Sequence, residues 1–309
     1  MHNHQKTLRQ KIQISGRGLH TNKQIDMVLT PRPENTGVWF QRTDSPGARP
    51  VLACGANVSD TSLATTIGVG GESVSTVEHF MAALGCLGVG NLQVDINGPE
   101  TPVLDGSALP WVELLANAGL RTLNSARPYF QVRRPFELKD GDKSIFMEPS
   151  SEMIVDFTID FPGYISNQRR AFTFTENNFV AEIASARTFC LLSEVEKMQS
   201  LGKALGGGLD NAVVISGDGS VLNQEGLRFP DECVRHKILD FLGDMTLAQA
   251  PVIGRFTVEK SGHSLNQSFL ATILRAPGLL ELVDPAKSAP EPYLPRLAQS
   301  PGLNQAWAN

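Results

Sequence analysis

The stretch STVEHFMAALGCLGVGNLQVDING, residues 75–98, predicts a helix, a glycine stop and a strand in immediate succession. The helical period is carried by Val77, Phe80, Met81 and Leu84. Gly85 and Gly88 end that pattern, because glycine commonly terminates a helix. Apolar residues then occupy every second position, at Leu92, Val94 and Ile96, which predicts a strand. The stretch therefore predicts a helix packed on a sheet, as in an α+β domain.

The rest of the first half continues this mixture. IQISGRGLHT and IDMVLTP alternate as strands around a glycine turn. LDGSALPWVELLANAGL predicts a second helix that ends at Gly119, and the polar, proline-containing residues 121–130 resemble a linker. Because 309 residues exceed the usual size of one core, we expect two α+β domains, residues 1–125 and 126–309.

The second half repeats the alternation of strands and helices. Strands are expected over residues 130–138, 144–148, 153–160, 211–216 and 253–259. Helices are expected over residues 191–204, 231–245 and about 264–275. From about Pro277 onward, proline and polar residues dominate, so an irregular tail is expected.

The bulk properties argue against a nucleic-acid or membrane partner. The formal net charge is −5, so there is no global basic field. No apolar run approaches the roughly 20 residues of a membrane span, and MHNHQKTLRQ lacks the apolar core of a signal peptide. A cytoplasmic location is therefore expected. The four cysteines are scattered, which favours reduced thiols over a disulfide framework.

The helix predicted within DECVRHKILDFLGDM, residues 231–245, carries a ladder of polar groups. His236, Asp240 and Asp244 follow one another at intervals of four, so they share one face. The ladder is either a solvated polar face or a grip on a metal ion by His236 and Asp240 from successive turns. A catalytic zinc site requires a third protein ligand and an open position.

His79 is the candidate for that third ligand, and two interpretations of its surroundings are equally supported. S-T-V-E matches a capping box in which Ser75 caps the helix and Glu78 reaches back, leaving His79 as an exposed neighbour. Alternatively, His79 binds the metal, and Glu78 is the base that takes a proton from water. The helix N-terminus favours the ionised form of Glu78 that a base requires.

Further residues suit an acyl-transfer site, although each has an ordinary structural explanation. His263, after a Ser-Gly turn, is either an exposed loop residue or an imidazolium acid that Asp244 keeps charged. Thr188 is either a strand-end residue or a donor to an oxyanion. The triple glycine 206–208 either stops a helix or admits a ligand close to the backbone. Lys237 and Lys260 lie beside candidate catalytic residues.

Several stretches in one order carry a resemblance to a known family. They are STVEHFMAAL, NGPETPVLDGSA, SARTF, LGGGLDNAVV, GLRFPDECVRHKILDFLGD and KSGHSLN. Together they closely resemble the UDP-3-O-(3-hydroxyacyl)-N-acetylglucosamine deacetylases, zinc enzymes of the committed step of lipid A biosynthesis in Gram-negative bacteria. The similarity runs from about residue 5 to 275. It implies two similar domains, each a sheet packed on helices, with the site between them and an apolar passage for the acyl chain.

The resemblance also implies roles for individual residues. It implies Zn²⁺ as the cofactor, bound by His79, His236 and Asp240. Glu78 is the implied general base, and His263 is the implied acid or electrostatic partner, supported by Asp244. The remaining implied roles are contact with the tetrahedral intermediate by Thr188, a catalytic role for Lys237, and substrate binding by Lys237, Lys260, Lys143, His20, Phe189 and Gly207.

The expected reaction is hydrolysis of the acetamide of an acylated UDP-N-acetylglucosamine by a monomer. One alternative is a zinc amidohydrolase that acts on a different acylated sugar nucleotide. Another is a catalytically inactive protein that only binds the same glycolipid precursor, although such a protein has no need of Glu78.

Overall fold

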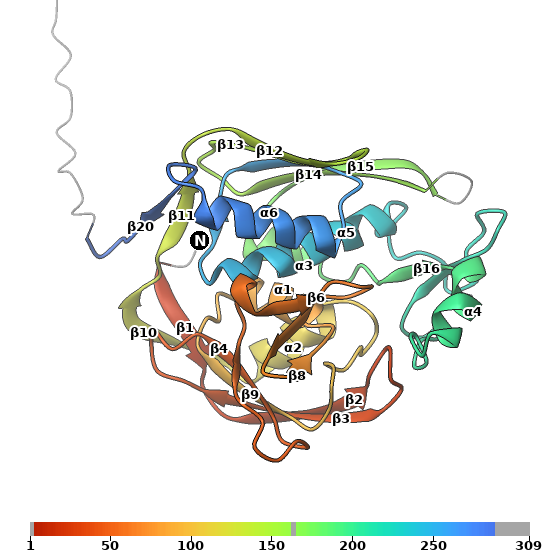
Figure 1. Cartoon of the computed structure of the whole chain (residues 1–309), viewed down its shortest axis with the longest axis horizontal. Coiled ribbons are helices and arrows are strands. Elements are labelled where there is room, and N and C mark those ends of the chain that lie inside the picture. The colour runs from red at the N-terminus through yellow and green to blue at the C-terminus, as the bar shows by residue number, and fades with distance from the viewer. Residues whose placement is uncertain (1–2, 162–164, 288–309) are drawn as a thin grey trace, which may run out of the picture.

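Two five-stranded sheets form opposite outer layers of the molecule, and the main helices lie between them (Figure 1). The computed structural model describes residues 3–161 and 165–287. Within these ranges, no helix has the length and apolar content needed to cross a bilayer. The order of layers is one sheet, its helices, the helices of the other unit and the second sheet. This arrangement confirms the expected α+β class.

The first sheet is built from the first third of the chain in the order β2-β3-β9-β4-β5. Its strands are β2 (Ile12–Arg17), β3 (Gln24–Pro31), β9 (Leu92–Ile96), β4 (Val38–Arg42) and β5 (Val51–Leu52). Helices α1 (Glu78–Leu87) and α2 (Leu109–Asn117) accompany it. The Phe80 ring of α1 meets Phe40 of β4 edge-on at 6.1 Å and Trp111 of α2 at 4.9 Å. These buried rings join the sheet to both helices.

The second sheet repeats the first in its connectivity, with the order β12-β13-β19-β14-β15. Its strands are β12 (Phe136–Asp140), β13 (Lys143–Glu148), β19 (Arg255–Glu259), β14 (Ile154–Phe161) and β15 (Ile165–Thr173). In both sheets the last strand along the chain enters the centre and runs parallel to the third. The repeated order confirms two similar units.

The helices of the second half that lie between the two sheets are α3 (Glu176–Glu182), α5 (Glu232–Met245) and α6 (His263–Arg275). Phe241 of α5 lies between Phe157 of β14 and Phe256 of β19, at centroid distances of 6.4 and 5.6 Å. Phe256 in turn meets Phe269 of α6 at 6.3 Å. This chain of rings fixes α5 and α6 against the inner face of the second sheet.

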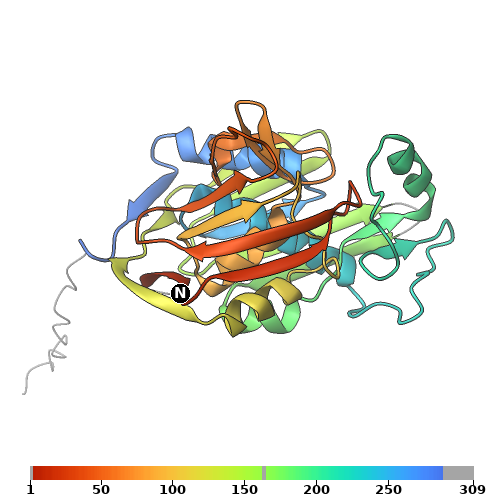
Figure 2. The same cartoon turned by 90° about the horizontal axis from the view of Figure 1, so that it is seen from below.

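Short elements complete the fold. They are β1 (His4–Leu8) with β10 (Leu120–Ala126); β6 (Val58–Asp60), β7 (Thr66–Val69) and β8 (Glu72–Val74); β18 (Val252–Ile253), β11 (Tyr129–Val132) and β20 (Leu280–Val283); β16 (Phe189–Leu191) with β17 (Val213–Ile215); and the 3₁₀ turns Gly55–Asn57 and Thr246–Ala248. Helix α4 (Leu192–Ser200) and the β16-β17 pair project from one end of the molecule (Figures 1 and 2).

Helices α1 and α5 approach closely where the two units meet. A Cβ atom at Gly243 would lie 2.1 Å from the carbonyl oxygen of Glu78, and one at Gly85 would lie 2.6 Å from Cγ2 of Thr246. Glycine at these two positions therefore allows the backbones to approach. The crossing places the first turn of α1 against the C-terminal half of α5.

Some expected elements differ from those observed. The strand expected over 130–138 is two strands, β11 and β12, and the helix expected over 191–204 ends at Ser200. No element was expected at β4, β15 or α3, all of which are present. The tail expected to be irregular from about Pro277 contains β20, which pairs with β11, because alternating Leu280 and Leu282 suit a strand edge. Residues 288–309 of that tail lie outside the described residues. The domain boundary at 125/126 stays a prediction.

Candidate metal centre and active site

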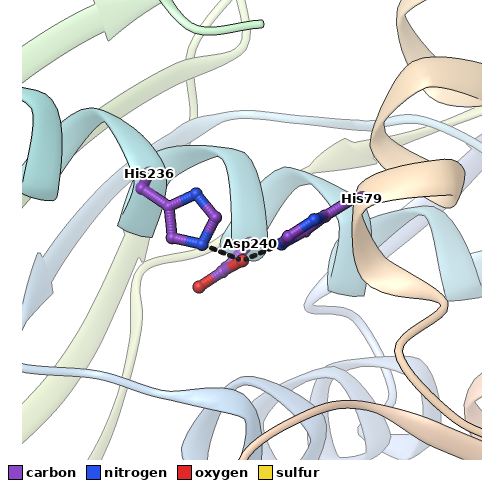
Figure 3. A group of neighbouring side chains, drawn as sticks. All are labelled: His79, His236 and Asp240. Atoms are coloured by element: carbon purple, nitrogen blue, oxygen red, sulfur yellow. Dashed lines mark ion pairs between the residues drawn. The ribbon is translucent and has the colours of Figure 1, made fainter. Parts of the chain in front are cut away.

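Three buried side chains from two helices converge on one point. The ligand atoms of His79, His236 and Asp240 all lie within 4.8 Å of one another. Oδ1 of Asp240 is 3.3 Å from Nε2 of His236 and 3.5 Å from Nε2 of His79 (Figure 3). His236 and Asp240 come from successive turns of α5, and His79 comes from the first turn of α1. Two imidazoles and a carboxylate can hold a divalent metal ion.

The hydrogen bonds around these residues fit a metal. Oδ1 of Asp240 is buried and has no hydrogen-bond partner among the described residues, which is costly unless a cation meets it. Nδ1 of His236 lies 3.1 Å from the carbonyl oxygen of Ala186, to which it donates. That bond leaves the lone pair on Nε2, the atom that faces Asp240. Burial also lowers the pKa of His236 to about 4, so its imidazole is neutral and suited to ligation.

Burial decides between the alternative interpretations of both helices. His79, His236, Asp240 and Asp244 are all buried, so the ladder is not a solvated face. The capping-box interpretation is also wrong, because the residue before α1 is Val77 and no side chain caps the helix. Thr76, which precedes this start, has a positive φ of 57°. A β-branched residue in that region is strained, as is common at functional sites.

Glu78 lies at the same point as the three ligands. Its Oε2 accepts a hydrogen bond of 3.0 Å from the backbone N–H of Thr65, and its Oε1 is 3.8 Å from Nε2 of His263. Burial raises the pKa of Glu78, and the nearby imidazole of His263 opposes this rise. The structure thus holds a carboxylate of enhanced basicity beside the candidate metal centre.

His263 opens α6 and is fixed by Asp244, the third rung of the α5 ladder. Its Nδ1 donates to Oδ2 of Asp244 at 2.9 Å. Burial lowers the pKa of His263, but the carboxylates of Asp244 and Glu78 outweigh it and raise the pKa to about 9. His263 is therefore an imidazolium at neutral pH, even at a helix N-terminus that disfavours positive charge.

Sequence reasoning missed the residues that hold Asp244. Thr65 donates from Oγ1 to Oδ1 of Asp244 at 2.5 Å, and Asn266 donates to Oδ2 at 2.8 Å. Ser261 donates to the amide oxygen of Asn266 at 2.6 Å, which orients that amide. Ser261 and Asn266 lie within KSGHSLN on either side of His263, so their nearness along the chain was a usable signal. Thr65 carried no comparable signal.

Lys237 lies against the metal centre. Its ammonium donates to Oδ2 of Asp240 at 2.7 Å. The other carboxylate oxygen, Oδ1, faces the imidazoles of His79 and His236. Burial disfavours both charges, yet the ammonium of Lys237 helps to hold the pKa of Asp240 well below its usual range. The pair keeps Asp240 ionised, as a metal ligand requires.

Phe189 and Thr188 lie on the His236 side of the centre. The Phe189 ring meets the imidazole of His236 edge-on, with the centroids 6.2 Å apart. Thr188 precedes it, and its backbone N–H donates to the carbonyl of Gly106 at 2.8 Å. Within the described ranges, the hydroxyl of Thr188 makes no hydrogen bond to the three metal ligands.

The triple glycine meets the first domain. The N–H of Gly206 donates to the carbonyl of Leu19 at 2.9 Å, and Gly207 follows in the same loop. His20 is buried: its Nδ1 accepts from the N–H of Ala204 at 3.3 Å, and its Nε2 has no partner among the described residues. The loop and His20 thus form one contact between the two units.

Two of the predicted lysines lie among carboxylates of the second sheet. Nζ of Lys260 is 3.2 Å from Asp142 and 3.3 Å from Asp160. Lys143 is exposed at the start of β13, directly after Asp142 in the chain. No ion pair or hydrogen bond in the described ranges connects either lysine to the three metal ligands.

Proteins of similar sequence indicate one family. The family model described as UDP-3-O-acyl N-acetylglycosamine deacetylase matches residues 5–275. Relatives named UDP-3-O-acyl-N-acetylglucosamine deacetylase include one from Geobacter sp. (strain M21), 46% identical over 281 residues, covering 91% of this chain and 92% of the relative. A relative of that name from Syntrophotalea carbinolica is 46% identical over 287 residues, 93% of each chain. Another, from Myxococcus xanthus, is 43% identical over 282 residues, 90% of this chain and 89% of the relative. The chain therefore belongs to the UDP-3-O-acyl N-acetylglycosamine deacetylase family.

Proposed function

We propose that this chain is a zinc-dependent deacetylase that removes the N-acetyl group of UDP-3-O-(3-hydroxyacyl)-N-acetylglucosamine and releases acetate. This reaction is the committed step of lipid A biosynthesis. The observation that carries the proposal is the unpartnered, buried Oδ1 of Asp240 facing the Nε2 atoms of His79 and His236. Family membership and the names of the relatives support the same substrate. A monomeric, cytoplasmic enzyme is part of the proposal.

Zinc is the ion we propose, because two imidazoles and one carboxylate match the three-ligand sets of catalytic zinc sites. His79, His236 and Asp240 would hold it. The chemistry that zinc supplies when bound at such a site is a lowered pKa of water and a polarised carbonyl group. Lys237 would keep Asp240 charged, because it donates to the other carboxylate oxygen.

Glu78 and His263 divide the proton transfers. Glu78 takes the proton of the attacking water, since burial makes its carboxylate a stronger base. The acetamide nitrogen must receive a proton before the C–N bond breaks, because an amide anion is a very poor leaving group. His263 donates that proton from its Nε2 side, while Nδ1 stays bound to Asp244. The pKa values of the two groups are shifted in the sense that such a pair requires.

Substrate contacts are proposed from position. The hydroxyl of Thr188 donates a hydrogen bond to the oxyanion. Phe189, beside His236, lines the path by which the substrate reaches the metal centre. The projecting segment that includes α4 carries exposed apolar side chains that suit an acyl chain: Leu192, Leu201, Leu205 and Leu209. Lys237, Lys260, Lys143, His20 and Gly207 remain the proposed contacts of the UDP-sugar.

The test is metal content and acetate release in wild type and Asp240→Ala. We expect wild type to retain about one zinc per chain after dialysis, since three buried ligands converge. Asp240→Ala should lose the zinc and the activity together. Asp140→Ala, at an exposed aspartate that ends β12, is the matched control and should keep both.

Substrate identity is tested with the same preparation. Acylated UDP-N-acetylglucosamine should be deacetylated, and the substrate without its acyl chain should react much more slowly. Equal rates on the two would favour an amidohydrolase for another sugar nucleotide. A zinc-loaded protein that releases no acetate from the acylated substrate would point to a protein that only binds it. Full zinc retention by Asp240→Ala would remove Asp240 from the ligand set.

A further inference from the structure

A cavity lies between the two units, on the far side of α1 and α5 from the metal centre. Its volume is about 630 Å³, within the range of small-molecule sites. Its walls are largely apolar, with contributions from Met81 and Leu84 of α1 and from Leu242 and Met245 of α5. None of the metal ligands, Glu78 or His263 lines it.

Helical geometry keeps this cavity separate from the catalytic face. On α5, Leu242 and Met245 point away from the ladder of His236, Asp240 and Asp244, because the two sets are about half a turn apart. The cavity instead follows the C-terminal part of α1 and the turn after it. It is therefore a different site from the one that the family assignment concerns.

Arg127, in the connection between β10 and β11, brings a positive charge to this apolar space. Among residues 3–161 and 165–287, no carboxylate forms an ion pair with its guanidinium. Burial lowers the pKa of Arg127 to about 10, so the group remains charged at neutral pH without a partner that offsets its desolvation.

Two other charged residues, Glu176 and Lys6, bear on this end of the cavity. Glu176 is the acidic residue of the cavity lining, and its negative charge acts on Lys6. Burial lowers the pKa of Lys6, and Glu176 opposes that effect. Arg127 in turn lowers the pKa of Lys6, so two cations lie close together near this end of the cavity and favour an anion there.

We propose that the cavity binds an amphipathic carboxylate, with its head group at Arg127 and an unbranched apolar tail against the α1–α5 wall. Guanidinium groups bind carboxylates through paired N–H donors, which would complete the missing ion pair. The apolar side chains Met81, Leu84 and Met245 bury a methylene chain at no polar cost. A neutral alcohol of the same length lacks the head-group contact and binds less tightly.

The experiment is calorimetric titration of the full-length, zinc-loaded protein with decanoate and with decanol. We expect wild type to bind decanoate about tenfold more tightly than decanol. Arg127→Met should lose that preference, and Arg127→Lys should keep part of it. Arg121→Met, at an exposed arginine of the neighbouring β10, is the matched control and should bind both probes as wild type does.

A second variant tests the cavity itself. Gly90 lines its rim, and a Cβ atom there would meet nothing within 4 Å, so a side chain can be introduced at this position. We expect Gly90→Phe to abolish decanoate binding while acetate release stays near the wild-type rate. Decanoate binding that is absent from wild type, or equal in wild type, Arg127→Met and Gly90→Phe, would overturn the proposal.

Discussion

The substitution Gly243→Ala tests whether the approach of α1 to α5 sets the metal centre. The added Cβ would lie 2.1 Å from the carbonyl oxygen of Glu78 and 2.8 Å from its carbonyl carbon. Both are backbone atoms, so no flexible side chain can yield. Reaching even 3.0 Å, the shortest separation that Cβ atoms normally show, requires a movement of about 0.9 Å. The displaced residue immediately precedes the ligand His79.

The cost of this movement can be worked out in two ways. Overpacking at a helix crossing destabilises the fold by roughly 1–3 kcal/mol. A displacement of about 1 Å in a positioned catalytic group costs roughly 100-fold in rate. We therefore expect kcat/KM for acetate release to fall by about two orders of magnitude, with a protein that remains folded at the assay temperature.

The assay combines acetate release at saturating zinc, zinc content after dialysis and urea unfolding. Gly90→Ala is the matched control, because this glycine follows the other end of α1 and its Cβ would meet open space. That variant should match wild type in rate and zinc content. If Gly243→Ala stays folded and its kcat/KM lies within twofold of wild type, the close approach does not position the site, and the reasoning is refuted.

Three further predictions concern the surroundings of the site. Thr65→Val removes the 2.5 Å bond to Asp244 with little change of shape, so kcat/KM should fall about tenfold at unchanged zinc content; an unaltered rate would contradict this role. Asp244→Asn removes a carboxylate that raises the pKa of His263 to about 9, so the basic limb of the kcat/KM profile should move to lower pH; a limb that stays in place would assign the acid elsewhere. Arg187→Met leaves the buried Glu232 without its cation, so urea unfolding should show a loss of about 3–5 kcal/mol; a loss below about 1 kcal/mol would mean that the ion pair is dispensable.

Several features of the site followed from the sequence alone because they depend on local geometry. A spacing of four residues places His236, Asp240 and Asp244 on one side of any helix, whatever surrounds it. The helix–glycine–strand pattern of residues 75–98 likewise required only periodicity and glycine chemistry, and α1 and β9 occupy the expected places. The resemblance of ordered motifs pointed to the family, which the comparisons confirm.

Local periodicity could not decide whether those groups face water or one another. S-T-V-E suits a capping box as well as a metal site. In the structure Val77 precedes α1 and no side chain caps it, which excludes the cap, and packing buries both Glu78 and His79. Thr65, which contacts both Glu78 and Asp244, comes from a loop 13 residues before Glu78 and 179 residues before Asp244 and carried no signal. The periodicity of a segment is encoded in neighbouring residues, whereas burial and the meeting of distant side chains depend on how helices and sheets pack.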